Sequence, residues 1–262
     1  MCLIVVSIAN DPRYPLLVAA NRDEFFRRPT RDMHWWHGRE ILAGRDEQSG
    51  GTWLAVTPDA RVAAVTNVRE GTAAAGHRSR GELPLMALEQ KLSSLKVTLK
   101  DNPAQWSGFN LVVVSAEDGW YFSNRDAHPG RQLHRGIFGL SNHLLETPWP
   151  KLLRLRNAVG AQLSGHQGPT DQLHRTLINT LRDDTPAPDR DLPDTGVGLD
   201  MERFLSSPFV RGEHYGTRAS TIVTLDRDNQ VTVTEQIWGP EGRAGNQQQF
   251  TWQRQPPPSL QQ

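Results

Sequence analysis

The chain of 262 residues contains a single cysteine, Cys2. One cysteine excludes a disulfide within the chain and is typical of a protein from a reducing compartment. Net charge is also absent, because 29 basic residues balance 29 acidic ones, whereas nucleic-acid binders normally carry a basic face. No apolar run approaches the roughly 20 residues of a membrane-spanning helix, and segment 3–9 is too short for a signal peptide. We therefore expect a cytoplasmic protein with no nucleic-acid partner and no membrane insertion.

Metal-binding patterns are missing as well. The nine histidines are scattered, without an HExxH motif or the spacing of zinc ligands, so we predict no metal centre. There is no CxxCH motif, which excludes covalent haem attachment. Two tryptophans, Trp35 and Trp36, stand between His34 and His37. This segment either faces an aromatic ligand or is a partly packed loop.

The order of the predicted elements indicates the fold class. Apolar segments typical of strands are 2–8, 16–20, 52–57, 61–67, 110–115, 120–123, 136–140, 217–225 and 231–238. Apolar residues at helical spacing occupy 82–88, 90–99, 150–163 and 169–181. Because strands and helices come in blocks and do not alternate as in βαβ units, the pattern favours antiparallel sheets with helices outside them, an α+β fold. We predict one domain, residues 1–253, followed by a flexible tail, residues 254–262.

Cys2 directly follows the initiator methionine. Removal of Met1 would place a thiol and a free amine on one residue. The amine, with a pKa of about 8, can accept the proton of the thiol. Cys2 would then be a nucleophile that carries its own base. The alternative is a small buried side chain at the start of an apolar strand.

Four polar residues, Asn21-Arg22-Asp23-Glu24, end the second predicted strand. This strand end would lie beside Cys2 if the first two strands form a hairpin. A carboxylate such as Asp23 would then hold the ammonium group, and a cation such as Arg22 would stabilise a thiolate. A solvated loop is the alternative.

Further candidates stand at the ends of later strands. Asn67 and Asn142 each end a predicted strand. An amide at a strand end either caps a turn or donates to a developing oxyanion, and such a donor lowers the activation barrier by roughly 3 kcal/mol. Arg218 stands at the start of a late strand. It clamps a carboxylate, lowers the thiol pKa, or is an ordinary edge-strand side chain. Gly50-Gly51 permits close backbone approach, and a tight turn is favoured over a phosphate loop because no Gly-Lys-Ser/Thr ending follows.

Short motifs lie in a characteristic order along nearly the whole chain. They are Met1-Cys2, Asn21-Arg22-Asp23-Glu24, Gly50-Gly51-Thr52-Trp53-Leu54, Thr66-Asn67, Gly108-Phe109-Asn110-Leu111, Gly139-Leu140-Ser141-Asn142, Leu144-Leu145-Glu146-Thr147-Pro148-Trp149 and Tyr215-Gly216-Thr217-Arg218. The ordered set resembles the NRDE family, also called the transport and Golgi organisation protein 2 family. This resemblance implies a four-layer αββα sandwich of two antiparallel sheets, like that of N-terminal-nucleophile hydrolases.

A more distant similarity to the cysteine acylases of penicillin V and conjugated bile salts implies a set of site residues. In those acylases the N-terminal Cys is helped by an Asp, two Asn and a late Arg. The residues at comparable places here are Cys2, Asp23, Asn67, Asn142 and Arg218. One departure is Ala20, which stands where the acylases carry an Arg three residues before the Asp.

The family resemblance implies a first function, binding and trafficking of haem. The expected ligand-binding residues are Asn21, Arg22, Trp35, Trp36 and Arg218. Haem would be held without a covalent bond, with its propionates on Arg22 or Arg218.

The family's link to lipid and acyl-coenzyme-A metabolism implies a second function. The protein would be a cysteine amidohydrolase or thioesterase that acts on a hydrophobic acyl amide or acyl-coenzyme A. Cys2 would attack, Asn67 and Asn142 would stabilise the oxyanion, and Asp23 would orient the amine. A third possibility is a scaffold that keeps the hydrolase fold without its chemistry.

Overall fold

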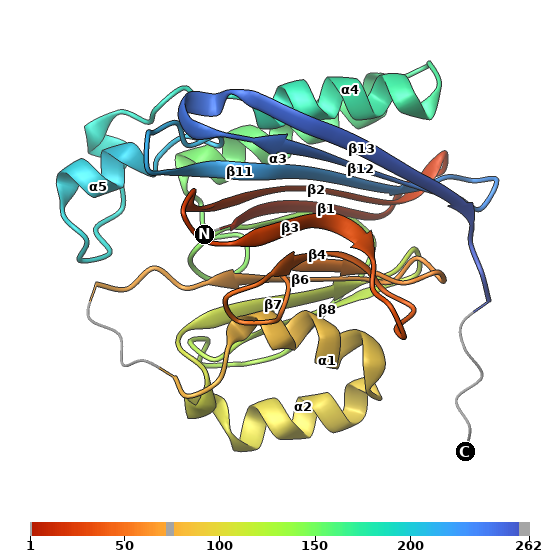
Figure 1. The fold of residues 1–262 in the computed structure, drawn as a ribbon, viewed down its shortest axis with the longest axis horizontal. Helices are drawn as coiled ribbons and strands as arrows, with labels where there is room; N and C mark the ends of the chain where they lie inside the picture. Colours follow the sequence, from red (N-terminus) through yellow and green to blue (C-terminus); the bar gives the residue numbers. More distant parts are fainter. Residues whose placement is uncertain (1, 72–75, 257–262) are drawn as a thin grey trace.

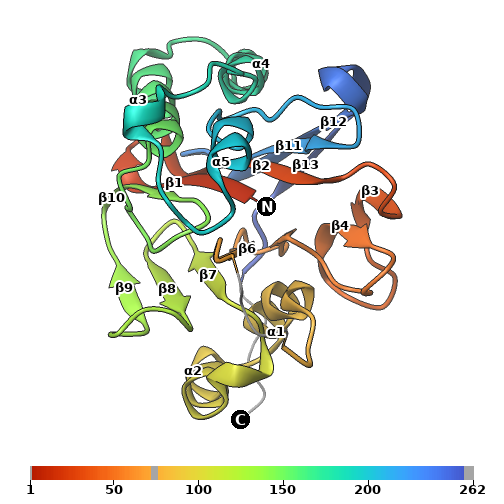
Figure 2. The same cartoon turned by 90° about the vertical axis from the view of Figure 1, so that its left-hand side faces the viewer.

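The computed structural model describes residues 2–71 and 76–256. Within these ranges the chain forms two antiparallel sheets, one of six strands and one of seven. The sheets stack face to face, and helices cover both outer faces (Figures 1 and 2). The predicted α+β sandwich with four layers is therefore confirmed.

The first sheet has the spatial order β10-β1-β2-β11-β12-β13. Its strands are β1 (Cys2–Asp11), β2 (Tyr14–Phe25), β10 (Gly136–Leu140), β11 (Tyr215–Leu225), β12 (Gln230–Trp238) and β13 (Ala244–Gln253). The predicted hairpin at the chain start is β1–β2, and the predicted late hairpin is β11–β12. Because β2 and β11 pair in the middle of the sheet, the first and last thirds of the chain meet there.

The second sheet has the spatial order β3-β4-β5-β6-β7-β8-β9. Its strands are β3 (Thr30–Trp35), β4 (Leu42–Asp46), β5 (Leu54–Val56), β6 (Val62–Asn67), β7 (Phe109–Val114), β8 (Gly119–Ser123) and β9 (Arg131–Leu133). Each strand pairs with its neighbour in sequence, so this sheet is a meander. Apolar side chains of both sheets, such as Val18 and Val112, form the core between them.

The helices cover the two outer faces. They are α1 (Leu83–Glu89), α2 (Leu92–Asp101), α3 (Pro150–Gly165), α4 (Thr170–Leu181) and α5 (Leu199–Phe204). Helices α3 and α4 pack on the first sheet, and α1 and α2 pack on the second. Pro150 begins α3, where its missing N–H would have had no helical partner. The short helix α5 lies near the start of β1 in both views (Figures 1 and 2).

Several elements are absent from the sequence-based prediction. Strands β3 and β13 are edge strands, and their composition is polar: β13 reads AGNQQQFTWQ and buries none of its residues fully. An edge strand with a solvated face needs few apolar residues, so hydrophobic alternation does not reveal it. Arg254, which opens the predicted tail, donates to the Asp59 carbonyl at 3.0 Å, while residues 257–262 of that tail lie outside the described part.

No helix in the described part of the chain is long and apolar enough to cross a membrane.

Candidate functional site

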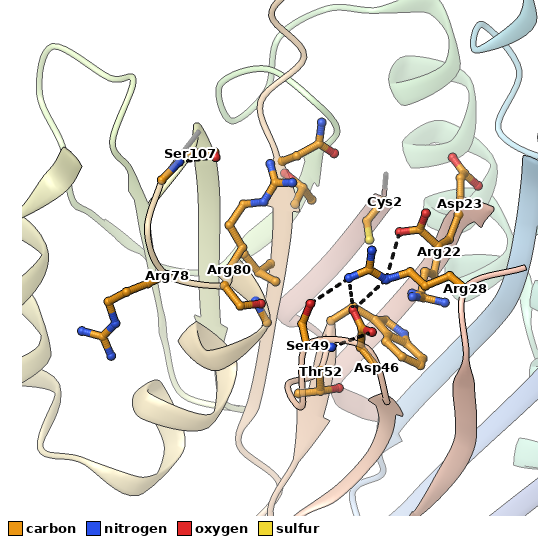
Figure 3. Close-up of a pocket in the computed structure, with 18 of the residues that line it drawn as sticks. Cys2, Arg22, Asp23, Arg28, Asp46, Ser49, Thr52, Arg78, Arg80 and Ser107 are labelled. Atoms are coloured by element: carbon orange, nitrogen blue, oxygen red, sulfur yellow. Dashed lines mark hydrogen bonds and ion pairs between the residues drawn. The ribbon is translucent and has the colours of Figure 1, made fainter. Parts of the chain in front are cut away.

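A cavity of about 440 Å³ opens where the chain begins, with walls from both sheets (Figure 3). Its volume falls within the range of roughly 300–1,000 Å³ that is typical of small-molecule sites. Four residues predicted from the sequence line it: Cys2, Arg22, Asp23 and Asn67. The structure thus brings residues from the ends of β1, β2 and β6 to one place.

Strand register places the thiol of Cys2 beside a cation. Cys2 is directly opposite Arg22 in the β1–β2 pair, and opposite residues of neighbouring strands share a face. Ala20, two residues before Arg22, is on that face too, but it is opposite Ile4. Ala20 has no charge to replace the arginine of the acylases, but Arg22 places a guanidinium next to the Cys2 thiol. Burial raises the pKa of the Cys2 thiol, and the Arg22 charge partly offsets that rise.

Arg22 is buried yet has no ion-pair partner among the described residues. Its guanidinium stacks on the Trp53 ring at 4.2 Å from the ring centroid, and its Nη1 donates to Thr30 Oγ1 at 3.4 Å. Burial of a charge without a counter-charge is costly. A cation held in this way at the wall of a cavity favours an anion there, either the Cys2 thiolate or an anionic group of a ligand.

Two other residues of this strand end, Asp23 and Asn21, have different surroundings. The buried carboxylate of Asp23 lines the cavity and accepts a hydrogen bond from Thr217 Oγ1 at 2.7 Å. Asn21 does not line the cavity; its amide donates to the backbone carbonyls of Leu181 at 2.8 Å and Pro208 at 2.9 Å. Asn21 thus ties β2 to the segments outside the first sheet and has a structural role.

Asn67 and Asn142 lie in contact, although only Asn67 lines the cavity. Asn142 is fully buried, and its Nδ2 donates to Asn67 Oδ1 at 3.0 Å. This bond fixes the orientation of the Asn67 amide. Asn67 Nδ2 donates to the Val68 carbonyl at 3.3 Å, and an amide nitrogen has two N–H groups. The second N–H has no partner among residues 2–71 and 76–256 and can donate to an oxyanion in the cavity, with Asn142 as a positioning residue.

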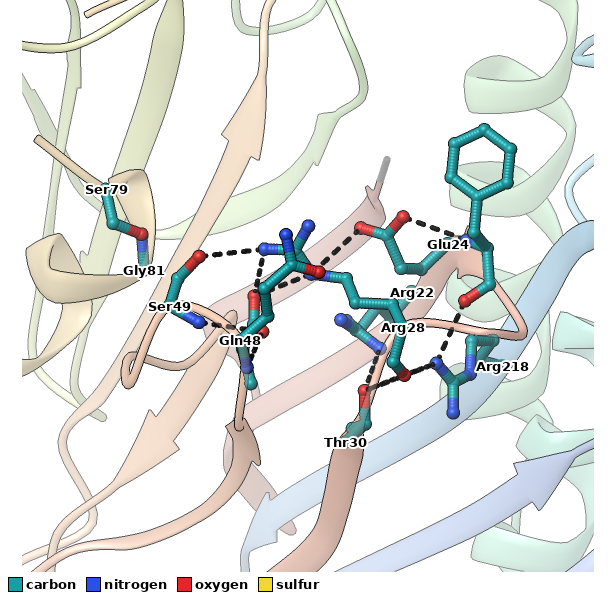
Figure 4. A network of polar contacts seen from close by, with 11 residues as sticks. Arg22, Glu24, Arg28, Thr30, Gln48, Ser49, Ser79, Gly81 and Arg218 are labelled. Atoms are coloured by element: carbon teal, nitrogen blue, oxygen red, sulfur yellow. Dashed lines mark hydrogen bonds and ion pairs between the residues drawn. The ribbon is translucent and has the colours of Figure 1, made fainter. Parts of the chain in front are cut away.

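Arg218 is not among the residues that line the cavity. It occupies a bulge of β11, where the pairing with β2 shifts register. Its guanidinium donates to the carbonyls of Phe25 at 3.0 Å and Arg28 at 2.6 Å, and to Thr30 Oγ1 at 3.3 Å (Figure 4). Arg218 therefore holds the segment between β2 and β3, which carries Arg28 into the cavity wall.

Trp35 and Trp36 lie away from the cavity. Trp36 is buried in the core between the second sheet and α1 and α2, and its Nε1 donates to the Ala43 carbonyl at 3.0 Å. Trp35 is 42% exposed, with its ring 5.1 Å from that of Trp252. The two neighbours thus have different surroundings, and neither is among the residues that line the cavity at Cys2.

The cavity also contains charged residues that the sequence did not single out. Arg28 forms an ion pair with Asp46 at 2.7 Å. Arg80 comes from the 3-10 turn Arg80–Glu82, which lies against the Gly50-Gly51 motif. A Cβ atom on Gly51 would lie 2.3 Å from the backbone of Gly81. Two glycines permit such a close approach, which the sequence indicated beside the favoured tight turn, but the contact partner could not be predicted from it.

A second group of charges is sealed from solvent next to the cavity. Arg69 and Glu202 form an ion pair in which both side chains are less than 5% exposed. Backbone N–H of Arg69 also donates to the Asn142 carbonyl at 2.7 Å. Lys151 is equally buried and donates to the Leu205 carbonyl at 3.0 Å. Burial lowers the pKa of Lys151 to about 7. These residues come from loops and helix starts without a common pattern, so no sequence signal indicated them.

The cavity is lined by the groups that acyl transfer requires: a thiol, a carboxylate, an amide donor and a cation. Within residues 2–71 and 76–256, no three His, Cys, Asp or Glu side chains gather closely enough to hold a metal ion.

Comparisons with known proteins agree with the motif order. The sequence model of the family described as Transport and Golgi organisation 2 matches residues 1–240. The chain is 37% identical to the Transport and Golgi organization protein 2 homolog of Bos taurus and 36% identical to that of Homo sapiens, in each case over 90% of this chain and 92% of the relative.

Two solved structures are similar at low identity. A mutant conjugated bile acid hydrolase from Clostridium perfringens aligns over 97% of this chain and 98% of its own, with a TM-score of 0.49 and 8% identity. An N-acylethanolamine-hydrolyzing acid amidase ortholog from Caenorhabditis elegans covers 84% of this chain and 92% of its own, with a TM-score of 0.43 and 12% identity. The match of the family model and the identity to the two homologs decide the assignment: this chain belongs to the Transport and Golgi organisation 2 family.

Proposed function

We propose that the cavity at Cys2 is the active site of a cysteine hydrolase that cleaves an amide or thioester bond next to a hydrophobic acyl group. One observation carries the proposal. Cys2 of β1 faces a cavity of about 440 Å³ together with Arg22 and Asp23 of β2 and Asn67 of β6. A buried thiol in a purely structural role needs none of these partners.

The reaction begins once Met1, which lies outside the described residues, has been removed. The amine of Cys2 accepts the thiol proton, and the thiolate attacks the carbonyl carbon of the substrate. The second N–H of Asn67 stabilises the oxyanion, and the Asp23 carboxylate holds the ammonium group. The C–N or C–S bond then breaks, and the leaving amine or thiolate takes the proton from that ammonium.

An acyl thioester on Cys2 remains after this first half-reaction. Water attacks the thioester, and the amine of Cys2 accepts the proton of the water. Collapse of the intermediate releases the carboxylic acid and restores the thiol. Arg22 favours the thiolate at both ends of the cycle because its charge opposes the rise in pKa that burial causes.

The test is turnover of p-nitrophenyl octanoate, an activated ester whose acyl transfer releases a coloured product. We expect an initial burst of p-nitrophenolate equal to the concentration of protein whose mass shows loss of Met1. The Cys2→Ala variant should show no burst, and Cys2→Ser should be slower by about two orders of magnitude or more. A burst that survives in Cys2→Ala would refute the proposal.

Haem binding remains a second proposal, and the buried guanidinium of Arg22 favours it because a propionate is a carboxylate that could pair with it. It predicts a saturable Soret shift on titration with haem, weakened in Arg22→Gln. A shift that heat-denatured protein reproduces would reject this second proposal. For either function we propose the cytoplasm as the location, since a lone thiol stays reduced there.

A further inference from the structure

The charges that line the cavity do not balance. Arginines in its wall are Arg22, Arg28, Arg78 and Arg80, and the acids are Asp23, Glu24 and Asp46. Arg22 is explained by its place beside the thiol. The question is which of the remaining cations already have a counter-charge.

Two of them do. Arg28 is paired with Asp46 at 2.7 Å and lies 3.9 Å from Glu24. Arg78 is paired with Glu82, outside the cavity lining, at 2.7 Å. Arg80 has no ion pair with any acid in the described part of the chain, and Glu70, another nearby carboxylate, is paired with Arg125 at 2.8 Å.

Arg80 is nevertheless held in place. Its Nη1 donates to the Gly108 carbonyl at 3.1 Å. The backbone of its 3-10 turn is fixed to the segment just before β5, because Thr52 N donates to the Gly81 carbonyl at 2.8 Å and Gly51 packs directly on Gly81. A cation that is fixed before a ligand arrives loses little conformational entropy on binding.

Arg80 and Cys2 stand on opposite sides of the cavity (Figure 3). A ligand that reaches Cys2 with its carbonyl carbon can therefore extend across the cavity to the guanidinium. The five N–H groups of a guanidinium match carboxylate and phosphate oxygens. We propose that Arg80 binds an anionic group, a carboxylate or a phosphate, at the end of the substrate remote from the bond that Cys2 cleaves. This inference rests on the proposed function for the identity of the reacting end.

Binding is measured on the Cys2→Ala variant, which cannot react, so that the result does not depend on turnover. The probes are the neutral octanamide and two derivatives that carry an anion at the other end of the chain, 8-amino-8-oxooctanoate and 8-phosphonooxyoctanamide, titrated by calorimetry at low salt. We expect the two anions to bind and octanamide to bind at least about tenfold more weakly, since a charge-assisted pair is lost. Tighter binding of the phosphate derivative than of the carboxylate derivative identifies a phosphorylated substrate, and the reverse preference identifies a substrate with a remote carboxylate.

The decisive comparison adds Arg80→Gln or Arg78→Gln to this protein. Arg80→Gln should weaken anion binding about tenfold or more and leave octanamide unchanged, whereas Arg78→Gln, which removes a cation already paired with Glu82, should change anion binding less than about threefold. Equal affinity for anions and octanamide, or equal effects of the two substitutions, would overturn the inference. A different result would refute the hydrolase proposal and leave this inference standing: p-nitrophenyl octanoate is not turned over, but anion binding still depends on Arg80.

Discussion

The open cavity at Cys2 and the sealed cluster at Arg69 are neighbours along residues 67–69, yet they treat charge in opposite ways. In the sealed cluster Arg69 is paired with Glu202. Burial lowers the pKa of Lys151 to about 7, so its amine can be buried without a proton and without a charge. In the open cavity the guanidinium of Arg22 has no counter-charge among the described residues. A structural charge needs its partner inside the protein, whereas a cation of a binding site is completed by the ligand.

The largest expected effect comes from breaking the sealed pair. Glu202→Ala leaves the Arg69 guanidinium buried without its partner and should lower the free energy of unfolding by about 3–5 kcal/mol. Urea denaturation measures it. The control is Asp200→Asn on the same short helix, whose carboxylate is 99% exposed and should matter by less than about 0.5 kcal/mol. Similar losses in both variants would remove the distinction between the two regions.

A matched pair of amides separates activity from stability. Asn67→Ala, at the cavity wall, should lower kcat for p-nitrophenyl octanoate about 10²–10³-fold with a small loss of stability. Asn142→Ala, which is fully buried, should lose activity and also about 1–3 kcal/mol of stability, because Asn67 Oδ1 loses its donor. An Asn67→Ala variant with unchanged kcat would show that the amide does not bind the oxyanion.

Lys151 makes the sealed cluster sensitive to pH. The pKa of Lys151 is lowered to about 7 in the folded protein, against about 10.4 when unfolded. Between these values the unfolded chain binds more protons, so stability rises with pH. The wild type should therefore gain up to roughly 1.4 kcal/mol per pH unit relative to Lys151→Met from pH 7 towards pH 10. A difference between the two proteins that does not vary with pH would contradict the burial of a neutral amine.

The smallest effect tests Arg22 in the open cavity. Arg22→Gln removes a cation that lowers the thiol pKa, so the pKa of Cys2 rises further and less thiolate exists at neutral pH. Alkylation by iodoacetamide at pH 7.5 should slow by about tenfold per unit of pKa, and the rate profile should move to higher pH. Stability should fall little or even rise, in contrast to Glu202→Ala.

The control for this prediction is Arg39→Gln, since Arg39 also lies over a tryptophan ring, that of Trp36 at 5.8 Å, but outside the cavity. It should leave alkylation unchanged. Unaltered or faster alkylation in Arg22→Gln would mean that the guanidinium does not act on the thiol.

The parts of the site that come from local pairing could be predicted from the sequence. Two apolar segments around a short turn predict the β1–β2 hairpin, and this hairpin places Cys2 opposite Arg22. Asn67 followed from its position at a strand end. These inferences need only the period of a strand and the geometry of one turn.

The rest depends on tertiary contacts that no local pattern encodes. Arg80 reaches the cavity because Gly51 packs on Gly81 across two distant segments. Arg218 looks like a site residue in sequence, but a bulge directs its guanidinium to the backbone carbonyls of Phe25 and Arg28. Sequence order cannot decide such cases, since a one-residue shift in register changes the face on which a side chain lies.

Intact-mass measurement after brief incubation with p-nitrophenyl octanoate tests the central claim most directly. The account predicts protein that begins at Cys2 and gains one octanoyl group, which peptide mapping locates on the Cys2 thiol and which disappears as water completes the cycle. Protein that retains Met1, or an octanoyl group found only on lysine side chains, would contradict it.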